Sequence, residues 1–482
     1  MTMPFWKRCK PLEANKQHGE GQQLKRTLSG RHLMMMGVGA IVGTGIYTLT
    51  GIGAGLAGPG VILSFLLCGI LCTCAALCYA EMATMIPTAG SAYTYTYTVL
   101  GEFLAWIVGW SLILEYTVAA SAVAVGWSGY VSSFLHMAGW AVPEQLLHGV
   151  MSGGMIDLPA VMITMVVAAL LILGSRESAF VTSLLVIIKL IALLLFVSLA
   201  IGHFSLANFH PFLPFGAGVH IGEDGVKRGV LAASALIFFA FYGFDAVSTA
   251  SEETKNPDRD LKVGIVGSMA LSTVIYVLVA LAALGASYYS VFSRSGAPLA
   301  FILSSLHYGW ASQLVSAAAI IALPSVIVVL MYGQSRIFFA MARDGLLPRK
   351  LSVINAKRGT PVLMTVITGV IVALLAATLR LDEIALLANA GTLCAFIAVA
   401  FCVLVMRTRQ PNAPRSFRTP LPWLVAPLCI VGCGYLFVNG LPKVTQIWFV
   451  VWNAIGLAIY FAYSIRASLL SGQHIPGQSP AE

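Results

Sequence analysis

The stretch that decides the fold is Met36-Gly-Val-Gly-Ala-Ile-Val-Gly-Thr-Gly-Ile-Tyr47. It is an apolar segment of membrane-spanning character that is interrupted at its middle by Gly39, Gly43 and Gly45. Each glycine disfavours helix by ~1 kcal/mol relative to alanine, so three close together predict a local break. A break at this depth is tolerated only where it is buried in protein or lines a cavity, and it exposes N–H groups at a positive helix end. We therefore expect a mid-membrane site for an anionic group such as a carboxylate, as in a transporter.

The composition of the whole chain places it in a membrane. Of its 482 residues, 58% are hydrophobic and 10% charged, and the mean hydropathy of +0.87 is too high for a soluble globular protein. A transmembrane helix needs ~20 apolar residues, and this template predicts about twelve spans. Their approximate boundaries are 34–56, 61–86, 97–126, 158–175, 179–202, 229–251, 263–287, 312–342, 361–380, 383–407, 421–438 and 445–467.

The basic residues predict the orientation of these spans. With the N-terminus inside, most lysines and arginines lie in cytoplasmic loops, and twelve spans return the C-terminus to the cytoplasm. The opposite side receives only Lys227, Arg228, Arg294, Arg380 and Lys443. The net charge of +9 is therefore an orientation signal. We expect no nucleic-acid partner, because no soluble domain presents a basic face.

A second interrupted span suggests an internal repeat. The sixth span carries Phe238-Phe-Ala-Phe-Tyr-Gly-Phe-Asp-Ala-Val247, with Gly243 and the acidic residue Asp245 at its centre. Interrupted spans at matching positions of two halves are typical of inverted-repeat transporters, and five spans per half invert the second half. The expected organisation is a cytoplasmic tail 1–30, a core 31–407 with repeats of about 31–203 and 229–407, a loop and two helices in 408–468, and a cytoplasmic tail 469–482.

Four charged side chains lie deep in the predicted spans: Glu81, Glu115, Lys189 and Asp245. Each costs at least ~2.5–3.5 kcal/mol at the centre of a helix, so each needs a partner or a function. Lys189 has nothing polar for a turn on either side, and burial favours its neutral form. We prefer a function in proton coupling, or as a fixed cation that replaces sodium beside the first span, to a lysine that reaches an interface.

The sequence allows two roles each for Asp245 and Glu115 and favours one role for Glu81. Asp245 can cap the helix that follows the break or attract a substrate ammonium group, and we favour the cap slightly. Glu115 can face the same cavity or form an ion pair within the bundle, and the sequence favours neither. Glu81 ends the second span near the cytoplasm, where we expect a structural role. Phe241 to Phe244, beside the break, are expected to line or gate the cavity.

The sequence carries no catalytic signature. It has no phosphate-binding Gly-Lys-Ser/Thr loop, no nucleophile elbow and no His-Glu-x-x-His helix, so we expect no enzyme, no cofactor and no use of ATP. The cysteine pairs Cys68/Cys72 and Cys74/Cys78 have helical i,i+4 spacing. Small thiols that pack between helices are preferred to a metal site, because no histidine joins the run.

Three longer runs are similar to a known family. They are Gly37–Gly53, Phe-Tyr-Gly-Phe-Asp-Ala-Val-Ser-Thr-Ala-Ser-Glu-Glu-Thr-Lys-Asn-Pro from Phe241 to Pro257, and Tyr-Gly-Gln-Ser-Arg-Ile-Phe-Phe-Ala-Met-Ala-Arg-Asp-Gly-Leu-Leu-Pro from Tyr332 to Pro348. The chain resembles the amino acid–polyamine–organocation superfamily over almost all of residues 30–468, and most closely its bacterial cationic amino acid transporters. This resemblance implies an all-α, LeuT-like membrane fold of two inverted five-helix repeats with discontinuous helices 1 and 6, plus two C-terminal helices.

The same resemblance implies which residues form the site. The substrate carboxylate would meet backbone amides of the first break, and the α-amino group would meet carbonyls of the sixth. With the two nearby acids, the expected substrate-binding residues are Ile41, Gly43, Thr44, Gly45, Phe239, Ala240, Tyr242, Gly243, Asp245 and Glu115. Lys189 would take the place of sodium, next to the carbonyl of Gly39 and the hydroxyl of Ser325.

The resemblance leaves the substrate open. Pro324, in Ala322-Leu-Pro-Ser325, is expected to kink the eighth span and to reshape the distal pocket. We expect a secondary active, proton-coupled transporter of cationic and/or small neutral L-amino acids in a bacterial cytoplasmic (inner) membrane. An amino acid/polyamine exchanger and a non-transporting amino acid sensor are the alternatives. The expected partners are the amino acid, protons and membrane lipid, and a small membrane partner remains open.

Overall fold

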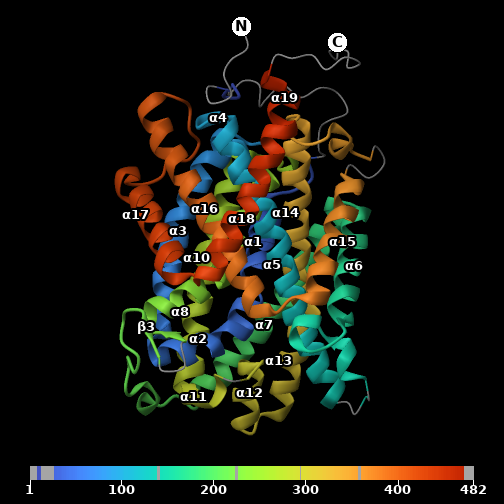
Figure 1. Ribbon diagram of the computed structural model, residues 1–482. Coiled ribbons are helices and arrows are strands. Elements are labelled where there is room, and N and C mark those ends of the chain that lie inside the picture. Colours follow the sequence, from blue (N-terminus) through green and yellow to red (C-terminus); the bar gives the residue numbers. More distant parts are fainter. Residues whose placement is uncertain are drawn as a thin grey trace.

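The computed structural model describes residues 8–11, 26–137, 140, 142–222, 226–293, 295–355 and 360–471. Helices that lie side by side along one long axis make up nearly all of it, with α17 (Pro422–Tyr435) at one edge and α6 (Leu158–Leu173) with α15 (Val362–Thr378) at the other (Figure 1). Two small antiparallel hairpins complete the described fold. They pair β1 (Leu147–His148) with β2 (Ile156–Asp157), and β3 (His220–Ile221) with β4 (Lys227–Arg228).

The predicted all-helical membrane class is confirmed. Among the described residues, nine helices or continuous helical runs are long and apolar enough to cross a membrane, and α6 and α15 are shorter apolar helices. The remaining helices are α1 (Gly30–Ile41), α2 (Thr50–Ala57), α3 (Val61–Met85), α4 (Ala92–Val99), α5 (Glu102–Met137), α7 (Ser175–Ile201), α8 (Val230–Ile237), α9 (Ala246–Thr249), α10 (Pro257–Ala286), α11 (Tyr289–Phe292), α12 (Pro298–Ser305), α13 (Gly309–Ala322), α14 (Pro324–Arg343), α16 (Leu381–Arg409), α18 (Lys443–Ile459) and α19 (Ile465–Ala467).

The outer helices expose large apolar side chains. Val166 on α6, Leu194 on α7, Val431 on α17 and Ile447 on α18 are each more than 60% exposed. A soluble monomer rarely shows apolar surface of this extent, so these faces are suited to contact with lipid acyl chains.

Two predicted spans are divided. The third begins as α4 and resumes as α5 after Leu100 and Gly101, because Gly101 has a φ of +107°. The eighth is divided into α13 and α14 at Leu323, because Pro324 has no N–H to donate and stands at the start of the second helix. The interruption falls at the place where Pro324 predicts a kink.

Both predicted helix breaks are present. Helix α1 ends at Ile41, Val42 is extended with ψ of 93°, and a π-helical turn over Gly45–Leu49 leads into α2. Helix α8 tightens into a 3₁₀ turn over Phe238–Phe241, and Tyr242 is extended with ψ of 144°. The chain then turns at Gly243, whose φ is +110°, before it enters α9.

Charged groups fasten the end of the bundle at which α3 and α16 finish. Glu81 accepts hydrogen bonds from Arg407 at 2.8 Å and Arg415 at 3.1 Å, so it ties α3 to α16 and the loop that follows. Its role is structural, as predicted. In the N-terminal segment, Arg8 contacts Glu102 at 3.2 Å and Lys10 contacts Asp344 at 2.7 Å.

Candidate functional site

The two breaks lie against each other, backbone to backbone. A Cβ atom added at Gly45 would lie 2.3 Å from the Cα of Ala240, a distance that real Cβ atoms do not show. A Cβ added at Gly243 would lie 2.5 Å from the Cβ of Ala40, and the positive φ there also favours glycine. Because these two residues are glycines, the two interrupted spans come into close contact at their breaks, where main-chain groups are exposed.

Tyr276 of α10 joins the two breaks. Its hydroxyl lies 2.5 Å from the carbonyl oxygen of Ile41 and 2.7 Å from that of Ala240. These are carbonyls that a helix break leaves without their helical partners. Sequence reasoning missed Tyr276, because one tyrosine in an apolar span gives no signal of a partner 235 residues away in the chain.

The first break is in direct contact with α5 and α14. The site for a Cβ at Gly43 is only 2.6 Å from Cγ2 of Val326, the third residue of α14. Thr44 packs against Gly126 of α5, and its hydroxyl has no hydrogen-bond partner among the described residues. A valine methyl thus stands beside the main chain that is expected to receive a carboxylate. Sequence reasoning also missed Val326, because valine is common in any membrane helix.

Lys189 connects three helices. Its ammonium group donates to the carbonyl oxygen of Gly39 at 2.6 Å and to the hydroxyl of Ser325 at 3.0 Å. The side chain is fully buried, so α7 contributes a cation held between α1 and α14. The structure thereby brings together the three residues expected to take part in proton coupling. Tyr47, beyond the break, donates to the carbonyl of Lys189 at 3.1 Å.

Asp245 lies at the N-cap position, directly before α9 begins at Ala246, but it does not cap that helix. Its side chain makes no capping hydrogen bond; instead, Oδ2 accepts from the hydroxyl of Tyr116 at 2.5 Å. The predicted cap is wrong because the turn at Gly243 directs the carboxyl towards α5. The other oxygen, Oδ1, has no hydrogen-bond partner among the described residues.

Glu115 is buried without a counter-charge in the described part of the chain. Neither carboxyl oxygen has a hydrogen-bond partner there, and no ion pair to Glu115 is present in that part. Its Cβ lies 2.8 Å from the site for a Cβ at Gly391 of α16, and Asp245 and Tyr242 are its electrostatic neighbours. The ion pair that sequence allowed for Glu115 is thus not found among these residues.

The aromatic side chains after the sixth break divide into two groups. Tyr242 stacks on Phe239 with ring centroids 6.1 Å apart and meets Tyr116 edge-on at 5.9 Å. Phe241 packs between Phe65 and Tyr276, and Phe244 packs on Tyr79 and Phe396. Both phenylalanines are fully buried in packing, and the expectation that they line or gate the cavity stays a prediction.

Two ion pairs lie where the sixth span ends. Oε1 of Glu253 accepts from Nε of Arg336 at 3.0 Å and from Nη2 at 2.9 Å, and Tyr332 donates to the same oxygen at 2.6 Å. Nearby, Glu252 pairs with Arg343 at 2.8 Å. Sequence reasoning quoted these residues within longer runs but gave them no role. Their charge at the ends of apolar spans was the available signal.

The flanks of the two broken spans are also joined. Leu28, just before α1, pairs with Thr254, just after the sixth span, in a short parallel bridge. The amides of Thr27 and Leu28 donate to the carbonyl of Glu253, and the amide of Lys255 donates to that of Leu28. The first and sixth spans are thus connected by main chain as well as by packing.

Comparison with known proteins gives a uniform result. The family model described as amino acid permease matches residues 28–462. The chain is 43% identical over 454 residues to the branched-chain amino acid permease BcaP of Bacillus subtilis (93% of this chain, 95% of that protein). It is 40% identical to the methylthioribose transporter of the same organism (96% and 99%) and 37% identical to the vacuolar cationic amino acid transporter 2 of Arabidopsis thaliana (86% and 64%).

Proposed function

The chain belongs to the amino acid permease family, within the amino acid–polyamine–organocation superfamily, and on this premise we propose that it is a proton-coupled importer of small neutral L-amino acids. Its relatives are permeases and transporters, so it is a multi-pass membrane transport protein and not an enzyme.

The contact between the two breaks carries this proposal. An amino acid backbone has a carboxylate and an ammonium group only a few bonds apart. The main-chain N–H groups around Gly43–Gly45 suit the first, and the carbonyls around Phe239–Tyr242 suit the second. The carbonyl of Ile41, next to the first set, and that of Ala240, within the second, both lie within hydrogen-bond distance of the hydroxyl of Tyr276. This supports Tyr276 as a positioning residue for both halves of this main-chain clamp.

Small aliphatic side chains are the substrates that this geometry favours. Val326 presents a methyl group beside Gly43, where a long polar side chain would have no partner. Asp245 is engaged with Tyr116 rather than turned to that methyl group. A relative that is 43% identical over most of both chains is named a branched-chain amino acid permease, which supports the same choice.

A cationic substrate is the second candidate. The oxygens of Glu115 and Oδ1 of Asp245 lack hydrogen-bond partners among the described residues, and an ammonium or guanidinium group could supply them. Relatives named cationic amino acid transporters keep this candidate open. It requires the substrate side chain to pass Tyr242 towards α5.

We further infer a LeuT-like arrangement of twelve spans. The run Gly30–Met85 has 56 residues, and at 1.5 Å per residue a straight helix of that length would greatly exceed a hydrocarbon core of about 30 Å. It turns at Gly58, where φ is +63°, so we count it as two crossings. With α6 and α15 added, the nine candidate spans become twelve. The charge asymmetry supports cytoplasmic termini, and the Bacillus relatives support a bacterial cytoplasmic membrane.

Lys189 is the proposed coupling residue. A charged ammonium group binds the carbonyl of Gly39 and the hydroxyl of Ser325 more strongly than a neutral amine does. Gain or loss of the proton therefore changes how firmly α1 is held to α7 and α14. A coupling ion acts through such state-dependent contacts.

The test is uptake by proteoliposomes in sodium-free buffer, with and without an inward proton gradient. The substrate panel contains alanine, valine, leucine, lysine, arginine and methylthioribose. Gradient-driven accumulation of the neutral amino acids is expected. Accumulation of lysine or arginine alone would select the cationic candidate. Movement only against preloaded amino acid would make the protein an exchanger, and no movement would indicate a sensor or a missing partner.

A further inference from the structure

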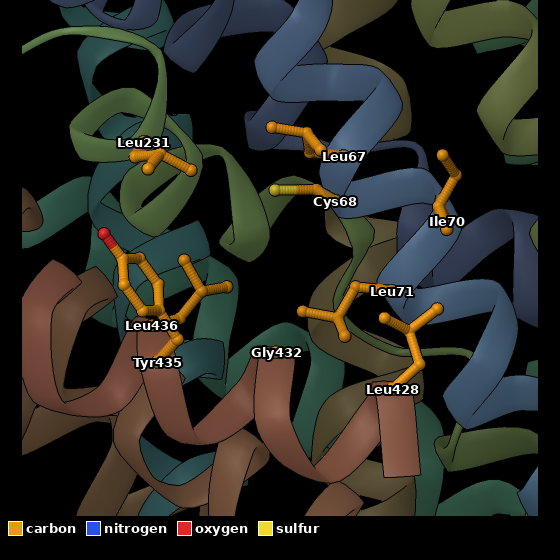
Figure 2. Close-up of a pocket in the computed structure, with 9 residues that line it drawn as sticks. All are labelled: Leu67, Cys68, Ile70, Leu71, Leu231, Leu428, Gly432, Tyr435 and Leu436. Atoms are coloured by element: carbon orange, nitrogen blue, oxygen red, sulfur yellow. The ribbon is translucent and has the colours of Figure 1, made fainter. Parts of the chain in front are cut away.

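A groove lies on the outside of the bundle, at α3, α8 and α17. Figure 2 shows its walls: Leu67, Ile70 and Leu71 come from α3, Leu231 from α8, and Leu428 with Gly432 from α17. Its volume is about 170 Å³, and its mouth is open, since Ile70 is 56% exposed. The groove is separate from the contact between the two helix breaks, because none of the break residues lines it.

The size and chemistry of the groove suit hydrocarbon. A cavity of about 150 Å³ lined by aliphatic side chains stays dry and can hold benzene, so this groove has room for a segment of one acyl chain. The thiol of Cys68 donates to the carbonyl of Ser234 at 3.2 Å, so it is not available to a polar ligand.

Lys227 joins the two segments that carry the lining residues Leu231 and Leu436. Lys227 lies four residues before Leu231, and its ammonium group contacts the carbonyl oxygen of Asn439 at 2.9 Å, three residues beyond Leu436. Tyr435, which also lines the groove, points its hydroxyl towards the Leu231 end in Figure 2. An apolar groove with a phenol in its lining and an amine on the segments that form its wall is complementary to an acyl chain that ends at a phosphate.

We propose that this groove binds one acyl chain of a phospholipid, with the lipid phosphate held at Lys227. The lipid would pack on α8, the first half of the interrupted sixth span. Helix α3 already holds α8 through Ser64, whose hydroxyl donates to the carbonyl of Val230 at 2.8 Å. The bound chain would add contacts from α8 to α17 and so stabilise the position of α8 shown here.

The full-length protein in phosphatidylcholine nanodiscs tests this site. They would contain a small fraction of phosphatidylglycerol with a photoactivatable diazirine on one acyl chain, and adducts would be mapped by peptide mass spectrometry. We expect adducts to concentrate at residues 67–71 and 428–436 and to be competed by unlabelled phosphatidylglycerol. The crosslinking experiment does not measure transport. Its result can therefore contradict the lipid site without contradicting the proposed function, and the reverse also holds.

Matched variants sharpen the test. In Gly432→Leu the new side chain enters the groove, because its Cβ would lie 2.6 Å from Cδ1 of Leu71, and adducts should fall about tenfold. Gly434→Leu on the same helix is the control, because its Cβ meets no described atom within 4 Å. Lys227→Gln should lower the adducts, and Lys227→Arg should retain them.

Three results would overturn the site. Adducts spread equally over the exposed faces of α6, α7 and α18 would indicate bulk lipid only. Adducts at residues 67–71 and 428–436 that survive Gly432→Leu would show that the lipid labelling these segments does not occupy the groove. Crosslinks between two copies of the chain through residues 428–436 would show that protein, not lipid, covers the groove.

Discussion

Lys189 donates a hydrogen bond of 2.6 Å to the carbonyl oxygen of Gly39, two residues before α1 ends at Ile41. A buried cation on one helix is thus bonded to the main chain of another at the edge of its break. The proposed coupling rests on this bond, because loss of the proton from the amine would weaken it and loosen α1.

Replacement of Lys189 by alanine tests that link. We expect Lys189→Ala to abolish uptake driven by a proton gradient, because the gradient then acts on no group between α1, α7 and α14. Counterflow of preloaded amino acid should be retained in part, since the main-chain clamp is intact. Lys350→Ala, at an exposed position, is the control and should behave like the parent. Parental uptake with an unchanged pH profile in Lys189→Ala would end the coupling role.

A single methyl group at Gly45 should disrupt the contact between the breaks. In Gly45→Ala the Cβ would lie 2.3 Å from Cα of Ala240, so main chain must move. We expect binding of every substrate to weaken by at least about tenfold, measured by substrate-dependent thermal stabilisation. Gly129→Ala is the matched control, because its Cβ meets no described atom within 4 Å. Loss for one substrate alone would argue that Gly45 borders a side-chain pocket instead.

Val326 should limit the size of the substrate side chain. Val326→Ala removes methyl groups beside Gly43, so leucine uptake should rise relative to alanine uptake by up to about tenfold. The ratio of kcat/KM for the two amino acids is the measurement. A fall for both amino acids in equal proportion would indicate that Val326 supports the helix and does not select the substrate.

The buried pair of Glu253 and Arg336 should be coupled energetically. Glu253→Gln leaves Arg336 buried without its carboxylate, and we expect a loss of about 3–5 kcal/mol in stability. Adding Arg336→Met removes the unpaired charge, so the double variant should lose less than the two single losses combined. Glu144→Gln, in an exposed contact with His148, should change stability by about 0–1 kcal/mol. Strict additivity in the cycle would contradict the coupling.

Asp157 should give the protein a measurable pH dependence. Its Oδ1 accepts from the hydroxyl of Ser128 and from the amide of Ala160, at the start of α6. Burial raises the pKa of this carboxyl from 3.8 to about 6, more than these hydrogen bonds lower it. The folded protein therefore holds the proton more tightly than the unfolded chain does. Stability should fall as pH rises from about 4 to about 6 and stay lower above that range.

Asp157→Asn isolates this contribution. The amide oxygen can still accept from Ser128 and Ala160, but it carries no titrating proton. The unfolding temperature of the variant should depend less on pH between 4 and 6 than that of the parent. Identical slopes in the two proteins would assign the dependence to other groups.

The sequence predicted those parts of the site that are unusual for a membrane helix. Clustered glycines gave the first break, and Gly243 with Asp245 gave the sixth. Lys189 was conspicuous because a buried charge is costly. Tyr276 and Val326 were not predictable, because their side chains are ordinary in apolar spans and matter only through contacts with distant segments. The cap by Asp245 failed for a related reason: local preference gave way to the hydroxyl of Tyr116.

Tyr276 has one hydroxyl proton and two carbonyl oxygens within reach, those of Ile41 and Ala240. It can donate to only one of them at a time. When the hydroxyl donates to the carbonyl of one interrupted span, the carbonyl of the other span has no donor. The ammonium group of an incoming substrate could be that donor. Without substrate, one of these two carbonyls therefore lacks a hydrogen bond. The substrate's ammonium group would supply it.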